Sequence, residues 1–339
     1  MINFCMAPGL DIPMVVNPNE ESLDQVIETH KITFIEQINR YGAILFRGFS
    51  CYDPESFSSA IASFGLGRRC STHDYDLART VLANDIYTSS DLPGSIPLPL
   101  HHEKPRSINP PNHLYFCCVT PPEADGGTIF ANAARIWADM PSVIQNELIK
   151  HGVLYKQFYH GQSSQYLVLK KILGSKWVKN WNEYFDTQDK KTIEERLRRD
   201  GVDWNWVNKG NDLVVLNHLP GALKHPITEQ TLWFNSSAYL NYFSNLIYGE
   251  LRNLRVHHYL SSRYFMSKDR FPLICHYGND QAFSADDIVQ IKRILQSHSQ
   301  VHYWERGDFM VVDNLTLMHG KQPHQGNRLL YSCMTEYIR

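Results

Sequence analysis

Three runs of aromatic and β-branched residues constrain the fold of this chain more than any other feature. They are HLYFCCVT at 113–120, FMVVDN at 309–314 and RLLYSCMTEYI at 328–338, and Gly, Pro, Asn and Asp bound them. Such runs are typical of β-strands. Because a helix-bearing section separates the first strand from the other two, we expect a β-barrel or jelly roll with helices packed outside it, rather than a parallel βαβ sheet.

Helical spacing and capping residues predict three outer helices. The apolar face of the first consists of Leu23, Ile27, Phe34 and Ile38. The second has Asp53 as a natural N-cap and Pro54 in its first turn, and Gly65 suits its C-terminal cap. The third begins with a capping box formed by Ser284 and Asp287.

Length and composition indicate an ordinary globular protein. The chain has 339 residues, of which 43% are hydrophobic, so it can bury a full core. Because no repeat, low-complexity tract or obvious linker divides it, we predict a single domain over residues 1–339. We expect a helical insertion at about 136–235, between the two halves of the barrel, to act as a lid and to supply substrate contacts.

Charge and cysteine usage narrow the class of partner. The formal net charge is -2 and there is no dense Lys/Arg tract, so neither nucleic acid nor a membrane is expected, and a small molecule is favoured. The start of the chain lacks the pattern of a secretory signal, and no stretch approaches 18 consecutive apolar residues, which predicts a cytoplasmic protein. The 7 cysteines form no CxxC pair, so we interpret them as reduced core residues.

A candidate metal motif lies in PLPLHHEKPR at 97–106. In an extended strand, alternate side chains share a face, so His101 and Glu103 can reach one ion while His102 points the other way. This is the one His-x-Glu or His-x-Asp in the sequence. A His-x-Glu at a sheet edge is more often a solvated pair or a hydrogen-bonded histidine than a metal site. The spacing alone therefore does not decide whether this motif binds a metal.

Eight sequence fragments, in this order and spacing, resemble the TauD/TfdA (taurine dioxygenase) family of Fe(II)- and 2-oxoglutarate-dependent dioxygenases. The similarity spans nearly the whole chain and is strongest to the SyrP-like and clavaminate-synthase-like branch. The fragments are GAILFRGF (42–49), IPLPLHHE (96–103), YFCCVTPPEADGGT (115–128), GVLY (152–155), HPITEQTLWFN (225–235), HYG (276–278), WERGDFMVVDN (304–314) and HGKQPHQGNR (319–328).

The resemblance implies a double-stranded β-helix (jelly-roll, cupin-like) core with flanking helices, and a metal site. His101, Glu103 and His319 would form the 2-His-1-carboxylate facial triad of non-haem Fe(II) oxygenases. Arg328 would bind the far carboxylate of 2-oxoglutarate, because a guanidinium presents a planar, permanently charged fork to a carboxylate. Thr128 would add a hydroxyl to the same carboxylate.

The resemblance also implies a reaction class. With Fe(II), 2-oxoglutarate and O2, the enzyme would hydroxylate an unactivated C–H bond of an amino acid or amino-acid-derived small molecule, free or carrier-bound, in the synthesis of an antibiotic or another specialised metabolite. Related halogenases carry a small residue where this chain has Glu103, so we expect oxygenation and not chlorination. Desaturation or cyclisation begins with the same hydrogen abstraction. A non-catalytic jelly-roll binding protein and a zinc hydrolase using the same ligands are alternatives from other classes.

Two departures from the family pattern bear on substrate recognition. Relatives usually show His-Gly-Arg where this chain has His-Gly-Lys at 319–321. They often show an arginine after the GVLY fragment, where this chain has Lys156. Iron and cosubstrate binding should survive both changes. For contacts to the substrate, we name Trp233 and Asn235.

Overall fold

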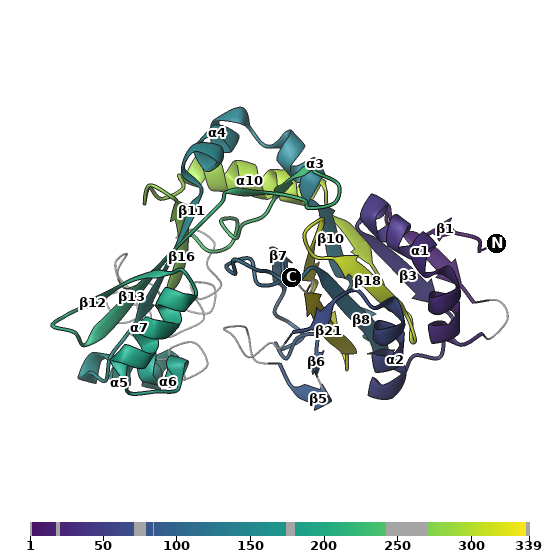
Figure 1. Cartoon of the computed structure of the whole chain (residues 1–339), viewed down its shortest axis with the longest axis horizontal. Coiled ribbons are helices and arrows are strands. Elements are labelled where there is room, and N and C mark those ends of the chain that lie inside the picture. Colours follow the sequence, from purple (N-terminus) through teal and green to yellow (C-terminus); the bar gives the residue numbers. More distant parts are fainter. Residues whose placement is uncertain are drawn as a thin grey trace. The chain divides into compact units, whose positions relative to one another are not determined.

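The chain divides into two compact units, which we describe separately. A computed structural model describes residues 2–17, 21–70, 79–83, 85–173, 180–241, 270 and 272–336 (Figure 1). Unit 1 comprises Met1–Asp139, Leu223–Phe234 and Ile294–Arg339, and unit 2 comprises Met140–Ala222 and Asn235–Arg293. The expected organisation, one domain with a lid inserted at about 136–235, stays a prediction.

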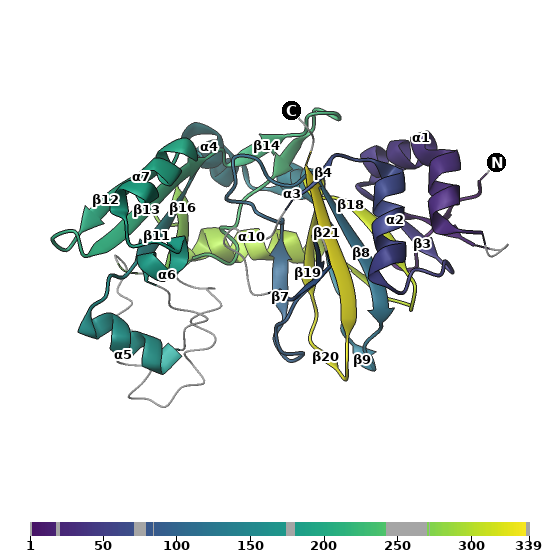
Figure 2. The ribbon, with the colours of Figure 1, turned by 60° about the horizontal axis from the view of Figure 1, so that its bottom comes forward.

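Within the described residues, unit 1 contains two main β-sheets (Figure 2). The larger sheet has the order β1 (Cys5–Met6), β2 (Pro13–Val16), β3 (Ala43–Arg47), β18 (Phe309–Asp313), β8 (His113–Thr120), β21 (Leu329–Glu336), β6 (Ile86–Thr88) and β5 (Val81–Ala83), with β4 (Arg68–Arg69) paired to β21. The smaller sheet has the order β17 (Gln300–His302), β10 (Thr128–Asn132), β19 (Leu317–Lys321) and β7 (Leu98–His101). Short ribbons pair β9 (Ala124–Asp125) with β20 (His324–Gln325), and β14 (Ala222–Lys224) with β15 (Thr231–Trp233).

The three predicted strand runs are confirmed as β8, β18 and β21, which lie side by side in the larger sheet. All pairs of both main sheets are antiparallel except the pair of β2 with β3. A βαβ arrangement is therefore excluded as the organising principle of unit 1. The prediction of a mainly β, jelly-roll core with flanking helices is confirmed.

The predicted helices begin and end close to their signals. Helix α1 (Leu23–Tyr41) and helix α2 (Pro54–Phe64) belong to unit 1, together with the short α3 (Ala133–Asp139). The Asp53 carboxylate accepts hydrogen bonds from the backbone N–H groups of Glu55 and Ser56, both at 2.9 Å, which caps α2 as expected. Gly65 ends this helix with a φ of 59°, a left-handed conformation that favours glycine.

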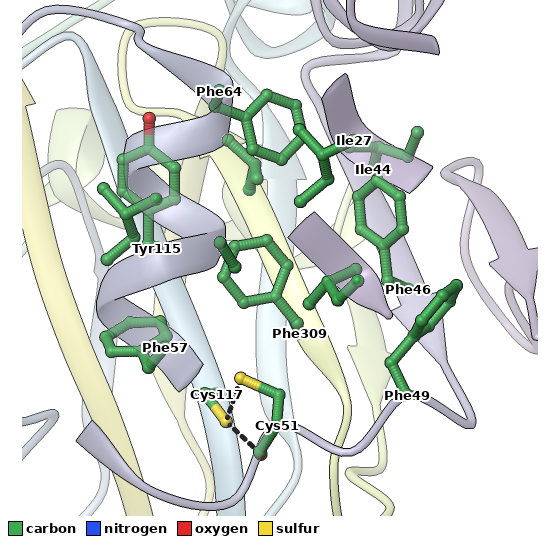
Figure 3. Close-up of a cluster of buried hydrophobic side chains, with 14 of the residues drawn as sticks. Ile27, Ile44, Phe46, Phe49, Cys51, Phe57, Phe64, Tyr115, Cys117 and Phe309 are labelled. Carbon is green, nitrogen blue, oxygen red and sulfur yellow. Dashed lines mark hydrogen bonds between the residues drawn. The ribbon is translucent and has the colours of Figure 1, made fainter. Parts of the chain in front are cut away.

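The larger sheet buries a different set of side chains on each face because side chains alternate along a strand. On one face, Tyr115 and Phe309 pack against helices α1 and α2 in an aromatic core (Figure 3). On the other face, Phe116 and Met310 belong to a second core, to which the smaller sheet contributes Phe130. The two sheets therefore form a sandwich with the helices outside.

Unit 2 has its own sheet, in the order β12 (Asp203–Val207), β13 (Asp212–Leu219), β11 (Val153–Tyr159) and β16 (Leu273–Tyr277). The described helices of this part of the chain are α4 (Ser142–His151), α5 (Ser164–Leu173), α6 (Trp181–Phe185), α7 (Lys190–Arg199) and α10 (Ala285–Ser297), of which α10 ends in unit 1. The predicted capping box of α10 is confirmed, since Ser284 N–H donates to the Asp287 carboxylate and Asp287 N–H donates to the Ser284 hydroxyl. In the described part of the chain, no helix combines the length and the hydropathy needed to cross a membrane.

The cysteines are all free thiols, as predicted. The interpretation of every cysteine as a core residue was wrong for two of them, because Cys5 is exposed and Cys70 is half-buried. Cys5 lies in β1, the edge strand of the larger sheet, and Cys70 directly follows the short strand β4. Cys51 and Cys117 meet in the aromatic core, with their Sγ atoms 3.4 Å apart (Figure 3).

The aromatic core gives a test of the packing. The Phe309 ring is fully buried and lies 5.8–6.3 Å from the rings of Phe57, Phe64 and Tyr115, measured between centroids. We expect Phe309→Ala to lower the free energy of unfolding by about 3–5 kcal/mol, because it leaves a cavity between sheet and helices. Ile32→Ala, which truncates a side chain that is 75% exposed on α1, is the control. Equal shifts of the urea midpoint in the two variants would contradict this packing.

Candidate metal centre

The candidate metal centre starts from the pairing of β7 with β19. His101 lies directly opposite His319 in this antiparallel pair, and the centroids of their rings are 4.4 Å apart. The pair is irregular beyond this point, since Lys321 is opposite Leu98. A Cβ atom on Gly320 would lie 2.7 Å from the Leu98 carbonyl oxygen, which is too close for any other residue. The glycine therefore permits the close approach of the two backbones.

Three side chains converge where β7 ends. His101, Glu103 and His319 each offer one ligand atom, and these atoms all lie within 4.8 Å of one another. The Nε2 atom of His319 is 3.8 Å from a carboxylate oxygen of Glu103. In the part of the chain that the structure describes, no other group of histidine, cysteine or acidic side chains meets this criterion. Two imidazoles and one carboxylate at this spacing fit a single divalent ion of the non-haem iron type.

His102 lies outside this group, as strand alternation predicts. Its side chain is 1% exposed, and its ring packs on that of Phe234 with centroids 4.3 Å apart. Burial, with a smaller contribution from the neighbouring His101, lowers the pKa of His102 to about 3. His102 is therefore a neutral, packed side chain next to the site.

Hydrogen bonds orient the side chains of this group. The Nδ1 atom of His101 is 2.8 Å from the Pro99 carbonyl oxygen, a contact that directs Nε2 toward the site. The buried amide of Asn314 accepts from the backbone N–H of Glu103 at 2.8 Å, and it donates to the carbonyl oxygens of Glu103 at 3.0 Å and Pro111 at 2.8 Å. Asn314 thus fixes the backbone that carries the carboxylate.

The electrostatics of the three side chains suit a cation. Burial would raise the pKa of Glu103, but the Arg79 guanidinium, 2.8 Å from its carboxylate, and the two histidines outweigh it and lower the pKa to about 2. Burial lowers the pKa of both His101 and His319. The site consequently presents an ionised carboxylate and two neutral imidazoles, which are the forms that bind metals.

A second polar group in the same unit joins Thr128, at the start of β10, to Arg328, the residue directly before β21. The Thr128 hydroxyl accepts hydrogen bonds from the Trp304 indole N–H at 2.7 Å and from the Arg328 guanidinium at 3.2 Å. Arg328 also lies 3.5 Å from the Ser89 hydroxyl. Lys321 is buried in β19, where it is paired with Thr128. Burial lowers the pKa of Lys321 to about 8, with a further contribution from Arg328.

The structure brings together most of the side chains that the sequence analysis named. The triad residues converge, and Thr128 contacts Arg328. Sequence reasoning missed Arg79, because nothing in its local sequence marks it and its contact joins separate segments. It quoted Trp304 and Asn314 within a fragment but gave neither a role.

The two residues named for substrate contacts are both buried. Trp233 is 0% exposed in unit 1, and its indole Nε1 has no hydrogen-bond partner among the described residues. Asn235 belongs to unit 2, where its amide donates to the Gly221 carbonyl oxygen and accepts from the backbone and hydroxyl of Ser237. Their role in substrate binding stays a prediction.

Comparison with known proteins identifies the family of the chain. A family model described as "Taurine catabolism dioxygenase TauD, TfdA family" matches residues 13–334. Over 322 residues, the chain is 23% identical to dapdiamide synthesis protein DdaC of Enterobacter agglomerans, with 95% of this chain and 89% of that protein covered. Over a further alignment of 322 residues, it is 24% identical to clavaminate synthase-like protein At3g21360 of Arabidopsis thaliana, with 93% and 86% covered.

A solved structure gives the same fold. The crystal structure of AAD-2 in complex with Mn(II) and N-oxalylglycine matches with a TM-score of 0.54 at 13% sequence identity, covering 100% of this chain and 98% of that one. The predicted family and its cofactors are confirmed. Because the family model covers almost the entire chain, the protein belongs to the TauD, TfdA family and is a non-haem iron dioxygenase that uses Fe(II), 2-oxoglutarate and O2.

Proposed function

We propose that this dioxygenase hydroxylates an unactivated C–H bond of an amino acid or an amino-acid-derived small molecule, free or carrier-bound, in specialised metabolism. One observation carries the proposal: His101, Glu103 and His319 form a complete two-histidine, one-carboxylate group, and His319 lies on β19, the strand that also carries the buried Lys321 opposite Thr128. The similarity to a dapdiamide synthesis protein supports a biosynthetic role. Membership of a dioxygenase family favours neither a binding-only jelly roll nor a zinc hydrolase.

In this proposal, each residue has a defined role. His101, Glu103 and His319 hold the iron, and Arg328 and Thr128 bind the far carboxylate of 2-oxoglutarate. Bound iron supplies the activation of O2 that removes a hydrogen atom from the substrate. Because Glu103 occupies the third protein position with a carboxylate, no ligand position among these residues is left for a halide.

The reaction type can be tested with isotopically labelled O2. Anaerobically purified protein is loaded with Fe(II) and given 2-oxoglutarate, chloride-rich buffer, labelled O2 and a panel of free amino acids and their amide derivatives. We expect oxygen uptake that depends on 2-oxoglutarate, release of succinate, and a product heavier by one labelled oxygen atom. Mass spectrometry of the products is the measurement, and omission of 2-oxoglutarate is the control.

Other products would change the proposal in defined ways. A chlorinated main product would contradict the role of Glu103 as a resident ligand. A product lighter by two hydrogen atoms would replace hydroxylation by desaturation or ring closure. If no free compound of the panel reacts but the carrier-protein thioester of one of these amino acids does, the substrate is carrier-bound.

Substitutions of the triad test the assignment of the metal ligands. We expect His101→Ala, Glu103→Ala and His319→Ala each to abolish stoichiometric Fe(II) binding, because each removes a ligand atom. His102→Ala should keep the metal, since its ring packs on Phe234 and not in the group. Iron content after anaerobic loading and desalting is the measurement, with circular dichroism as the check of folding. Loss of iron from the His102 variant and retention in the His101 variant would show that the strand register is wrong.

The role of Asn314 can be separated from general stability. Asn314→Leu removes the three hydrogen bonds that hold the backbone at Glu103 and Pro111. We expect it to weaken Fe(II) binding by about 10-fold to 100-fold, the usual cost of losing support behind a metal ligand. Thr316→Val is the matched control, because it removes a buried hydrogen bond to Asp313 from the same turn without touching Glu103. Fe(II) affinity is measured by isothermal titration. If Asn314→Leu and Thr316→Val lose the same affinity, Asn314 contributes to stability alone.

A further inference from the structure

Two cationic side chains of unit 1, the buried Lys321 and the half-buried Arg328, are both neighbours of Thr128. Lys321 is 4% exposed, although lysine is among the residues least often buried. It is paired with Thr128 across β19 and β10, and Thr128 accepts a hydrogen bond from Arg328 at 3.2 Å. The three side chains therefore form one group, which we call the cation cluster: Thr128, Lys321 and Arg328.

The cation cluster has no acidic partner. Among the described residues, the contacts of the Arg328 guanidinium are with the hydroxyls of Thr128 and Ser89, and the Lys321 ammonium contacts the Pro93 carbonyl oxygen at 3.4 Å. Neither side chain forms an ion pair with a carboxylate there. Placing a buried and a half-buried positive charge together without a counter-charge is unfavourable, because both lose hydration and repel each other. A group of this kind is suited to a bound anion.

The position of the cluster indicates which anion it binds. His319 and Lys321 are two residues apart on β19, and the regular pairing with β10 over these residues keeps both side chains on one face. Two residues of a strand span roughly 7 Å. A five-carbon dicarboxylate that binds the metal at one end can reach the cation cluster with its other end.

We infer that Lys321 is a second cation for the far carboxylate of 2-oxoglutarate, acting beside Arg328 and Thr128. The inference rests on the proposed function of this site. Arg328 supplies the planar fork, and Lys321 supplies a compact point charge on a flexible stem from the neighbouring strand. Two cations on one carboxylate give the enzyme strong discrimination against 2-oxo acids that lack the second carboxylate. The lysine that replaces the usual arginine after His-Gly thus has a function in cosubstrate selection.

Binding measurements test this role without turnover. Fe(II)-loaded protein is titrated under argon with 2-oxoglutarate and with 2-oxopentanoate, which has a methyl group in place of the far carboxylate. We expect Lys321→Met to weaken binding of 2-oxoglutarate by about 10-fold to 100-fold, the value of a charge-assisted contact, and to leave 2-oxopentanoate within about twofold of the wild type. Lys321→Arg should retain most of the affinity. Lys224→Met, which removes a lysine that is 68% exposed on the same unit, is the charge-matched control.

A stability measurement distinguishes binding from a structural role. Without a dicarboxylate, Lys321→Met should raise the melting temperature of the iron-loaded protein, because it removes the repulsion from Arg328. A lower melting temperature together with unchanged affinity for 2-oxoglutarate would show that Lys321 is structural, and the inference would be wrong.

The titrations also separate this inference from the proposed function. If the wild type binds 2-oxopentanoate as tightly as 2-oxoglutarate, the cation cluster is not the cosubstrate site, and the proposed roles of Arg328 and Thr128 fail with it. If the wild type discriminates and Arg328→Ala abolishes the discrimination while Lys321→Met leaves it intact, the proposed function stands and the role of Lys321 alone is overturned.

Discussion

The site depends on the pairing of β19 with two neighbours at once. Its contact with β7 places His319 opposite His101, and its contact with β10 places Lys321 opposite Thr128. Because side chains alternate along a strand, a slip of one residue in either pair would turn His319 or Lys321 to the other face. The smaller sheet therefore sets both ends of the site through its backbone hydrogen bonds, before any side chain contributes.

Charge is distributed unevenly along the face of the smaller sheet that carries His319 and Lys321. This distribution follows from the pairing of β19 with β7 and β10. At one end, the ionised Glu103 and two neutral imidazoles form a group that favours a cation. At the other end, Arg328 and Lys321 form a group that favours an anion. Neither group is at its lowest energy alone, because burial removes the water that would otherwise solvate the charges. In the roles that we propose, a metal ion and a dicarboxylate that bridges from it to the cluster would satisfy both.

The sequence predicted the parts of this arrangement that depend on local chemistry. Strand alternation separated His101 from His102, and the capping residues of α2 identified its first and last turns, because both signals lie within a few neighbouring residues. Arg79 and Asn314 could not be assigned in this way. Arg79 is 24 residues from Glu103 in the sequence, and Asn314 is 211 residues from it. Only folding brings these segments together. Thr128 and Arg328 were named through family resemblance, which carries such long-range information indirectly.

The two supports of Glu103 differ in kind, and the difference has a consequence for the site. Asn314 holds the backbone through neutral hydrogen bonds on both sides of the peptide, so its effect does not depend on the charge of the carboxylate. Arg79 holds the carboxylate itself, 2.8 Å away, and its side chain is only 13% exposed. An ion pair so little exposed is strong only while both members stay charged and well aligned, because each has lost its hydration. The backbone contact therefore fixes where the carboxylate is, and the ion pair keeps it ionised. The metal-binding role that we propose for Glu103 needs both properties, and two separate segments of the chain supply them.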